Sequence, residues 1–79
     1  MAPVIIYTTS WCPYCQTAKE YLTKKGIAFE ERNVEINFTA RDELGQKSGQ
    51  FGVPVLDIGG KIIVGFSTDE IDAVLASHA

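Results

Sequence analysis

The chain lacks the features of membrane-spanning, nucleic-acid-binding and zinc-binding proteins. Its longest apolar runs, at residues 4–7, 53–56 and 62–64, are only strand-sized, whereas a membrane-spanning helix needs about 20 apolar residues. Seven lysines and arginines are outnumbered by ten acidic residues, which gives a net charge of −3 and argues against a nucleic-acid partner. His78 is the only histidine, so no four-ligand zinc site is expected.

A secretion signal is also missing from the pattern of the chain. No basic segment followed by a long apolar segment occurs near residue 1, as it would in such a signal. We therefore expect a cytoplasmic protein with no membrane partner, a setting in which a cysteine pair is more often catalytic than structural. The 79 residues, 46% of them hydrophobic, suit one compact domain over residues 1–79, and we expect a monomer.

Both cysteines of the chain, Cys12 and Cys15, lie in a single C-x-x-C motif. The motif follows a strand-like apolar run and precedes a helix-like pattern, which is typical of a dithiol redox site. A structural disulfide is a weaker explanation, because cysteines so close together would cross-link almost no chain. We interpret the pair as a reactive dithiol.

A helix start at this motif would give the two cysteines different roles. Cys12 should cap the helix and face solvent, where the unpaired N–H groups and the positive end of the helix dipole favour its thiolate. Pro13 suits the first helical position, which needs no N–H, and Tyr14 can donate toward the sulfur. Cys15 lies one turn deeper, so we expect it to stay protonated and act as the resolving thiol.

Hydrophobic periodicity and turn residues predict seven elements in the order βαβαββα. Strands are expected at residues 3–8, 27–34, 54–58 and 61–65, and helices at 13–25, from a cap at 37 or 39 to about 48, and from 67 onward. The pair Gly59-Gly60 predicts a tight hairpin, and Ser67 with Glu70 has capping-box spacing. The fold class is therefore α/β, with the first two strands parallel in a four-stranded mixed sheet flanked by helices.

Three motifs follow one another along the chain: C-P-Y-C at residues 12–15, G-V-P-V at 52–55 and G-F-S-T-D at 65–69. Their order and spacing resemble the glutaredoxin family, a branch of the thioredoxin fold, over essentially the whole length. The first is similar to the dithiol active site and the second to a loop ending in a cis-proline. The third lies where the family has a Gly-Gly turn followed by acidic residues.

The resemblance implies a thioredoxin-like (glutaredoxin) fold with glutathione as co-substrate and no tightly bound cofactor. The backbone of Val53, beside a cis Pro54, would pair with a substrate like an added strand. The helix start near Ser67 and Thr68 would bind the γ-glutamyl carboxylate of glutathione. The residues expected to contact substrate or glutathione are Thr9, Trp11, Pro13, Tyr14, Gln50, Val53, Pro54, Gly65, Phe66, Ser67 and Thr68.

Some positions depart from the glutaredoxin pattern. Thr9 and Gln50 stand where many glutaredoxins have basic residues, and helix spacing makes Lys47 a solvated surface charge rather than a substitute. The segment around Phe66 is instead similar to redoxins that serve ribonucleotide reductase and are reduced by thioredoxin reductase, so both reductases are candidate partners. Phe66 is either an exposed docking residue or a cover for the core. Trp11 either forms a docking rim with Tyr14 or packs against its loop.

The chemistry predicted is that of a thiol–disulfide oxidoreductase. Thiolate Cys12 would attack a protein disulfide or a glutathione mixed disulfide, and Cys15 would resolve the mixed disulfide with a protein. Electrons would come from glutathione or from thioredoxin reductase. The alternatives are a glutathione-assisted dimeric iron–sulfur cluster carrier, which Pro13 disfavours, and a non-catalytic binding module, against which the intact C-P-Y-C weighs.

Overall fold

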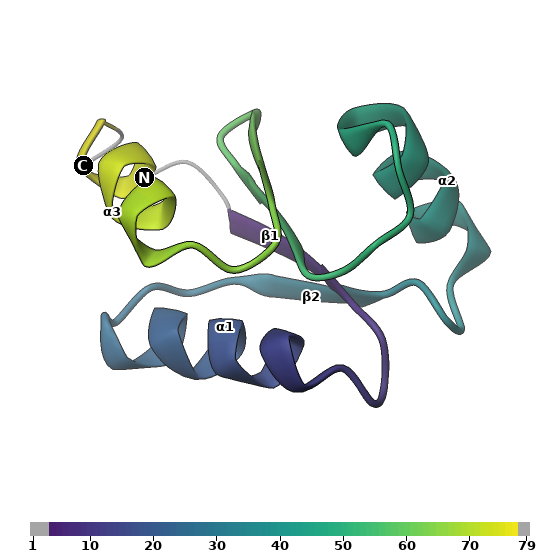
Figure 1. Cartoon of the computed structure of the whole chain (residues 1–79), viewed down its shortest axis with the longest axis horizontal. Coiled ribbons are helices and arrows are strands. Elements are labelled where there is room, and N and C mark those ends of the chain that lie inside the picture. The colour runs from purple at the N-terminus through teal and green to yellow at the C-terminus, as the bar shows by residue number, and fades with distance from the viewer. Residues whose placement is uncertain (1–3, 78–79) are drawn as a thin grey trace.

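The computed structural model describes residues 4–77, which form a four-stranded mixed sheet with helices on both faces (Figure 1). The elements in chain order are β1 (Val4–Thr8), α1 (Pro13–Lys24), β2 (Glu30–Asn33), α2 (Phe38–Ser48), β3 (Val55–Ile58), β4 (Lys61–Val64) and α3 (Thr68–Ser77). The strand order is β2-β1-β3-β4, with β2 parallel to β1 and the other pairs antiparallel. The predicted element order and fold class are confirmed. Residue 3 of the predicted first strand lies outside the described residues.

The central strand β1 is apolar because both of its faces are covered. Val4 and Ile6 pack with side chains of α1 and α3 on one face. Tyr7 packs with Ala40 and Leu44 of α2 on the other. Figure 1 shows α1 and α2 on opposite sides of β1 and β2. Alternate side chains of β1 thus enter different cores, which holds the strand in place between the two helices. The cysteine motif follows a few residues after the end of this strand.

Strand β2 is shorter than the predicted strand at residues 27–34. The end of α1 accounts for the difference, because Gly26 has a φ of 73° and its N–H donates to the Thr23 carbonyl at 3.0 Å. The N–H of Ile27 donates to the Leu22 carbonyl at 2.9 Å. This pair of bonds is a Schellman motif, so the first residues of the predicted strand instead complete the helix terminus.

Local signals place the other boundaries close to those predicted. Asn37, rather than Thr39, caps α2, and its Oδ1 accepts a hydrogen bond from the Ala40 N–H at 3.0 Å. The helix ends at Gly49, whose φ is 75°. Gly59 and Gly60 have φ values of 60° and 95°; positive φ at both central residues is what a two-residue hairpin turn of this hand requires.

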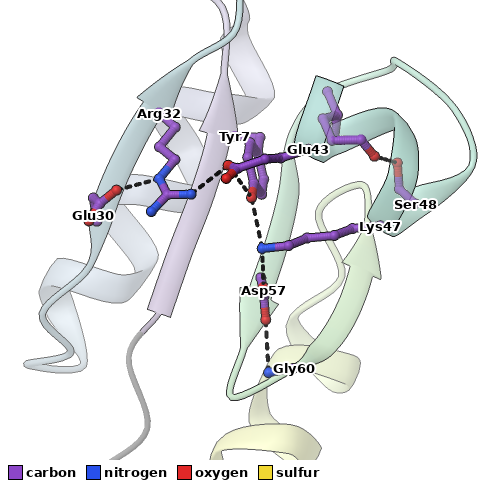
Figure 2. Close-up of polar contacts among 9 residues, drawn as sticks. Tyr7, Glu30, Arg32, Glu43, Lys47, Ser48, Asp57 and Gly60 are labelled. Atoms are coloured by element: carbon purple, nitrogen blue, oxygen red, sulfur yellow. Dashed lines mark hydrogen bonds and ion pairs between the residues drawn. The ribbon is translucent and has the colours of Figure 1, made fainter. Parts of the chain in front are cut away.

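A chain of polar side chains joins α2 to the sheet (Figure 2). Lys47 Nζ lies 2.7 Å from Asp57 Oδ2 of β3 and donates to the Tyr7 hydroxyl at 3.0 Å. The same hydroxyl donates to Glu43 Oε1 at 3.3 Å, and Arg32 of β2 also pairs with Glu43. Lys47 is an exposed residue, as predicted, but its charge is paired with Asp57 and not simply solvated. The pair forms because a carboxylate from the neighbouring strand lies within reach.

Candidate active site

Cys12 occupies the N-cap of α1, as the sequence predicts. Its backbone is extended, with φ −89° and ψ 113°, and Pro13 follows as the first helical residue. The Cys12 Sγ accepts a hydrogen bond from the Cys15 N–H at 3.2 Å. The sulfur thus takes the place of the capping oxygen that Ser or Asp usually supplies at a helix start.

The two thiols differ in how far solvent can reach them. Cys12 is largely buried at 9% exposure, so the prediction that it faces solvent is wrong; its sulfur lies against the Val53 carbonyl. Cys15 is 0% exposed and faces the core from the first turn of α1. Burial, followed by the hydrogen bond with Cys12, raises the pKa of the Cys15 thiol to about 12. Attack on an external disulfide therefore falls to Cys12, and Cys15 is positioned to attack a disulfide formed at Cys12.

The proline loop lies against the cysteine motif, and the glycine turn lies against the proline loop. The Val53–Pro54 peptide bond is cis, as the resemblance implies. The Cys12 Sγ lies 3.9 Å from the Val53 carbonyl oxygen, to which the thiol form donates. The Gly65 N–H donates to the Pro54 carbonyl at 2.8 Å, and Gly65 has a φ of +84°. Residues from three distant segments are thus brought to one place.

Two aromatic side chains border Cys12 and are open to solvent. Trp11 is 77% exposed and Tyr14 is 68% exposed. Trp11 is therefore not packed into its loop, and a docking rim formed by the two rings stays a prediction. Such amphipathic rings are well suited to contact a partner with little loss of conformational freedom.

Phe66 covers the core instead of projecting from it. Its ring meets the Tyr21 ring edge-on at 5.8 Å between centroids, and it is partly buried against the core shared by α1 and α3. Of the two interpretations left open by the sequence, core cover describes its contacts. The next residue, Ser67, accepts a hydrogen bond at its Oγ from the Glu70 N–H at 3.4 Å, which caps α3.

Thr9 and Gln50, the two predicted contacts at positions where the family pattern has a basic residue, lie in different environments. Gln50 turns back on its own loop, where its Nε2 donates to the Gly52 carbonyl at 3.1 Å and its Oε1 accepts from the Gly52 N–H. Thr9 instead lines a cavity of about 310 Å³ beside the cysteine motif. The lining residues are Thr9, Trp11, Val34, Glu35, Arg41 and Phe51.

Arg41 of α2 supplies the positive charge of this cavity, and it was not among the site residues predicted from the sequence. Its guanidinium lies over the Phe51 ring, 5.3 Å from the centroid. The Phe51 ring in turn lies over Gly45, where an added Cβ would come within 2.7 Å of it. An arginine one helical turn before a glycine, followed by an exposed aromatic residue, is the signal that could have indicated the stack.

Glu35 is the one acidic residue lining the cavity, and its charge is already engaged. The Ser10 N–H donates to Glu35 Oε2 at 3.0 Å. This backbone bond, then the Ser10 and Trp11 side chains, hold the pKa of Glu35 below its ordinary value. Glu35 therefore orients the loop before Cys12, and Arg41 remains as the cation that faces an incoming anion.

Searches for other classes of site give no competing candidate among residues 4–77. That part of the chain has no group of three or more His, Cys, Asp and Glu side chains able to hold one metal ion. None of the helices described there is long and apolar enough to cross a bilayer. His78 lies outside the described residues.

Comparison with known proteins gives a consistent result. The family model for glutaredoxin matches residues 4–63. A glutaredoxin-like 8.6 kDa protein from the rubredoxin operon of Clostridium pasteurianum is 47% identical over 70 residues, which cover 89% of this chain and 93% of the relative.

Solved structures agree with the sequence relatives. The glutaredoxin of Archaeoglobus fulgidus is 26% identical with a TM-score of 0.85, covering 95% of this chain and 87% of that one. A buckwheat glutaredoxin–glutathione complex is 26% identical with a TM-score of 0.70, covering 98% and 68%. With the dithiol at the helix start, these matches settle the assignment: the chain belongs to the glutaredoxin family of thiol–disulfide oxidoreductases.

Proposed function

We propose that the chain reduces glutathione mixed disulfides and protein disulfides with glutathione as its electron donor. The observation that carries this proposal is the cavity beside Cys12 that contains Arg41. It supplies a cation at a place where the sequence, with Thr9 and Gln50, had lacked one. The buckwheat relative, whose structure is a complex with glutathione, supports the same ligand class.

The cavity has the size and chemistry for one end of a small peptide thiol. A volume of about 310 Å³ is at the lower end of the range for ligand pockets. The guanidinium of Arg41 can bind a carboxylate with two parallel hydrogen bonds. Its stacking on Phe51 limits the orientations that the guanidinium can adopt. We therefore assign one carboxylate of glutathione to Arg41.

The start of α3 is the proposed contact for the other end of glutathione. The first N–H groups of a helix have no partner within the helix, and they attract an anion. Gly65 holds this helix start against the proline loop through its bond to the Pro54 carbonyl. The two anion contacts would then lie on either side of Cys12, with the Val53 backbone between them.

The reaction follows from the unequal exposure of the two thiols. Cys12, as thiolate, attacks one sulfur of the substrate disulfide; the Cys12–substrate bond forms and the other substrate sulfur leaves as a thiolate. With a glutathionylated substrate, Cys12 takes the glutathione, and a second glutathione thiolate releases it as oxidised glutathione. With a protein disulfide, Cys15 attacks Cys12, and two glutathione molecules later reduce the Cys12–Cys15 bond.

Reduction by thioredoxin reductase is a weaker proposal because the partial burial of Phe66 removes its expected docking residue. The prediction of ribonucleotide reductase as a partner depended on the same segment around Phe66 and is weakened in the same way. The relatives favour thiol exchange over the iron–sulfur carrier hypothesis. We place the proposed activity in the cytoplasm, with the chain acting as a monomer.

The test is NADPH consumption with a small glutathione mixed disulfide under two reducing systems. One system contains glutathione and glutathione reductase, and the other contains thioredoxin reductase alone. We expect turnover with the first system and little with the second. Turnover only with thioredoxin reductase would refute glutathione as the donor while leaving the dithiol chemistry intact.

The variant Arg41→Gln tests the assigned carboxylate contact. Loss of a charge-assisted bond at a partly exposed site should raise the KM for glutathione about three- to tenfold, with little change in kcat. Lys24→Gln, which removes a positive charge from the exposed end of α1, is the matched control. Equal KM values for the two variants would show that Arg41 does not bind the ligand.

A further inference from the structure

The burial of Cys15 creates a difficulty for the second half of the reaction with protein disulfides. Only a thiolate attacks a disulfide at a useful rate, yet Cys15 is 0% exposed. Burial raises the pKa of its thiol to about 12. The fold therefore needs groups close to Cys15 that stabilise its thiolate as the proton leaves.

Two groups favour the Cys15 thiolate, and neither belongs to the C-P-Y-C motif. The Thr9 backbone and the positive charge of Lys19 both lower the pKa of the Cys15 thiol. Cys12 and burial oppose them. Lys19 lies four residues after Cys15 in α1, so the two side chains share one side of the helix.

The position of the Lys19 ammonium is fixed by the neighbouring strand. Lys19 Nζ lies 2.9 Å from Glu31 Oε2 of β2, and the Lys19 side chain is only 21% exposed. The same oxygen of Glu31 accepts a hydrogen bond from the buried hydroxyl of Thr8 at 2.7 Å. Thr8 directly precedes Thr9, whose backbone lowers the pKa of the Cys15 thiol. The two thiolate-stabilising groups are thus tied to each other through Glu31.

We propose that Lys19 is an electrostatic positioning residue for the resolving step, held by Glu31 and Thr8 so that its charge favours the Cys15 thiolate. In this step Cys15 gives up its proton and attacks the Cys12 sulfur of the mixed disulfide. The Cys12–Cys15 bond forms, the Cys12–substrate bond breaks, and the substrate sulfur leaves with the bonding electron pair and takes up a proton. Lys19 makes no bond in the reaction and acts only through its positive charge.

This inference rests on the proposed dithiol function, and one experiment separates the two. The reduced protein is mixed with one equivalent of the aromatic disulfide dithiobis(nitrobenzoate). The release of the coloured thionitrobenzoate anion is followed by stopped-flow absorbance. Attack by Cys12 releases the first equivalent, and resolution by Cys15 releases the second. The first phase tests the proposed function, and the second tests the role of Lys19.

The variant Lys19→Gln should slow the second phase about three- to tenfold near neutral pH and leave the first phase nearly unchanged, because a single partly screened charge acts on Cys15. The pH at which the second phase reaches half its maximal rate should also rise. Lys19→Arg keeps the charge and should restore the wild-type rate. Lys24→Gln, with the same charge change on the same helix, should alter neither phase.

A second phase of unchanged rate and pH profile in folded Lys19→Gln would overturn the inference and leave the dithiol function standing. Equal slowing in Lys24→Gln would overturn it too, since net charge alone would then explain the effect. A slow second phase in Lys19→Arg as well would assign Lys19 a packing role. Failure of the wild type to release the second equivalent would overturn the inference and the dithiol function together.

Discussion

At the scale of single residues, the division of labour between the cysteines comes from one turn of helix. Cys12 is at the N-cap, where its sulfur accepts the Cys15 N–H, while Cys15 faces the apolar side of α1 with Ala18 and Leu22. A spacing of three positions places one sulfur at the helix terminus, where it keeps some exposure, and the other fully in the core. The two thiols therefore cannot exchange roles.

Substitution of each cysteine should separate the two reactions. Cys12→Ser should abolish all turnover, because the remaining thiol, Cys15, is fully buried. Cys15→Ser should abolish reduction of a protein disulfide, since the mixed disulfide cannot be resolved, but should retain removal of glutathione from a small substrate. Insulin reduction and the mixed-disulfide assay measure the two activities. Equal loss of both in Cys15→Ser would contradict the route through Cys12 alone.

Residue identities at the site were predictable where the chemistry is carried by a short motif. Cys12 contacts Cys15 and the Val53 carbonyl, and Gly65 contacts the Pro54 carbonyl, while the roles of these residues in binding stay predictions. Arg41 was missed because a helix pattern shows that a residue faces outward without showing what lies opposite it. The sequence could not decide whether Phe66 is a docking residue or a cover for the core. The contact that decides it is with the Tyr21 ring, which belongs to a helix far away in the sequence.

At the scale of elements, α2 is held to the sheet by charge as well as by apolar packing. Only Ala40 and Leu44 of α2 are buried, a small apolar contact for an 11-residue helix. Lys47 adds a link to Asp57 on β3 and to the Tyr7 hydroxyl on β1 (Figure 2). The end of α2 leads into the loop that carries Phe51 and Val53, so this link also steadies the loop beside Cys12.

Removal of this charged link should destabilise the fold measurably. Lys47→Met keeps the apolar stem but leaves the largely buried Asp57 carboxylate with the Gly60 N–H as its remaining partner. We expect a loss of about 1–3 kcal/mol in the free energy of unfolding, measured by urea denaturation. Lys61→Met, at an exposed position of β4, is the control and should change stability little. A similar loss in both variants would rule out the specific link.

Element boundaries were predictable where a local signal fixes them and less so where pairing does. Asn37, Gly49 and the Gly59-Gly60 turn mark their positions by backbone requirements that few other residues meet. The start of β2 had no such mark. Residues 27–29 are apolar and strand-like, but the bond from the Ile27 N–H to the Leu22 carbonyl joins them to the helix end, and the register with β1 begins only at Glu30.

At the scale of the whole molecule, three carboxylates join different parts of the fold and have lowered pKa values. The Thr8 hydroxyl, then Lys19, lowers the pKa of Glu31; the Ser10 backbone lowers that of Glu35; and the Tyr21 hydroxyl, then Lys25, lowers that of Asp72. These contacts link β2 to α1, the loop after β2 to the active-site loop, and α3 to α1. The folded chain therefore holds fewer protons than the unfolded chain in mildly acidic solution.

The sign of the pH dependence follows from these directions. A carboxylate whose pKa is lower in the folded state stabilises the fold at every pH above its unfolded pKa, and that stabilisation is lost as the pH falls through the folded pKa. For Glu31 the ordinary value is 4.5, so the urea midpoint should be flat from neutral pH down to about this value and fall below it. Glu31→Gln should flatten part of this acid slope, whereas Glu20→Gln, an exposed control on α1, should not. An identical acid slope in wild type and Glu31→Gln would show that the Thr8–Glu31–Lys19 contact does not contribute to stability, because a contact that stabilises only the ionised carboxylate must disappear on protonation.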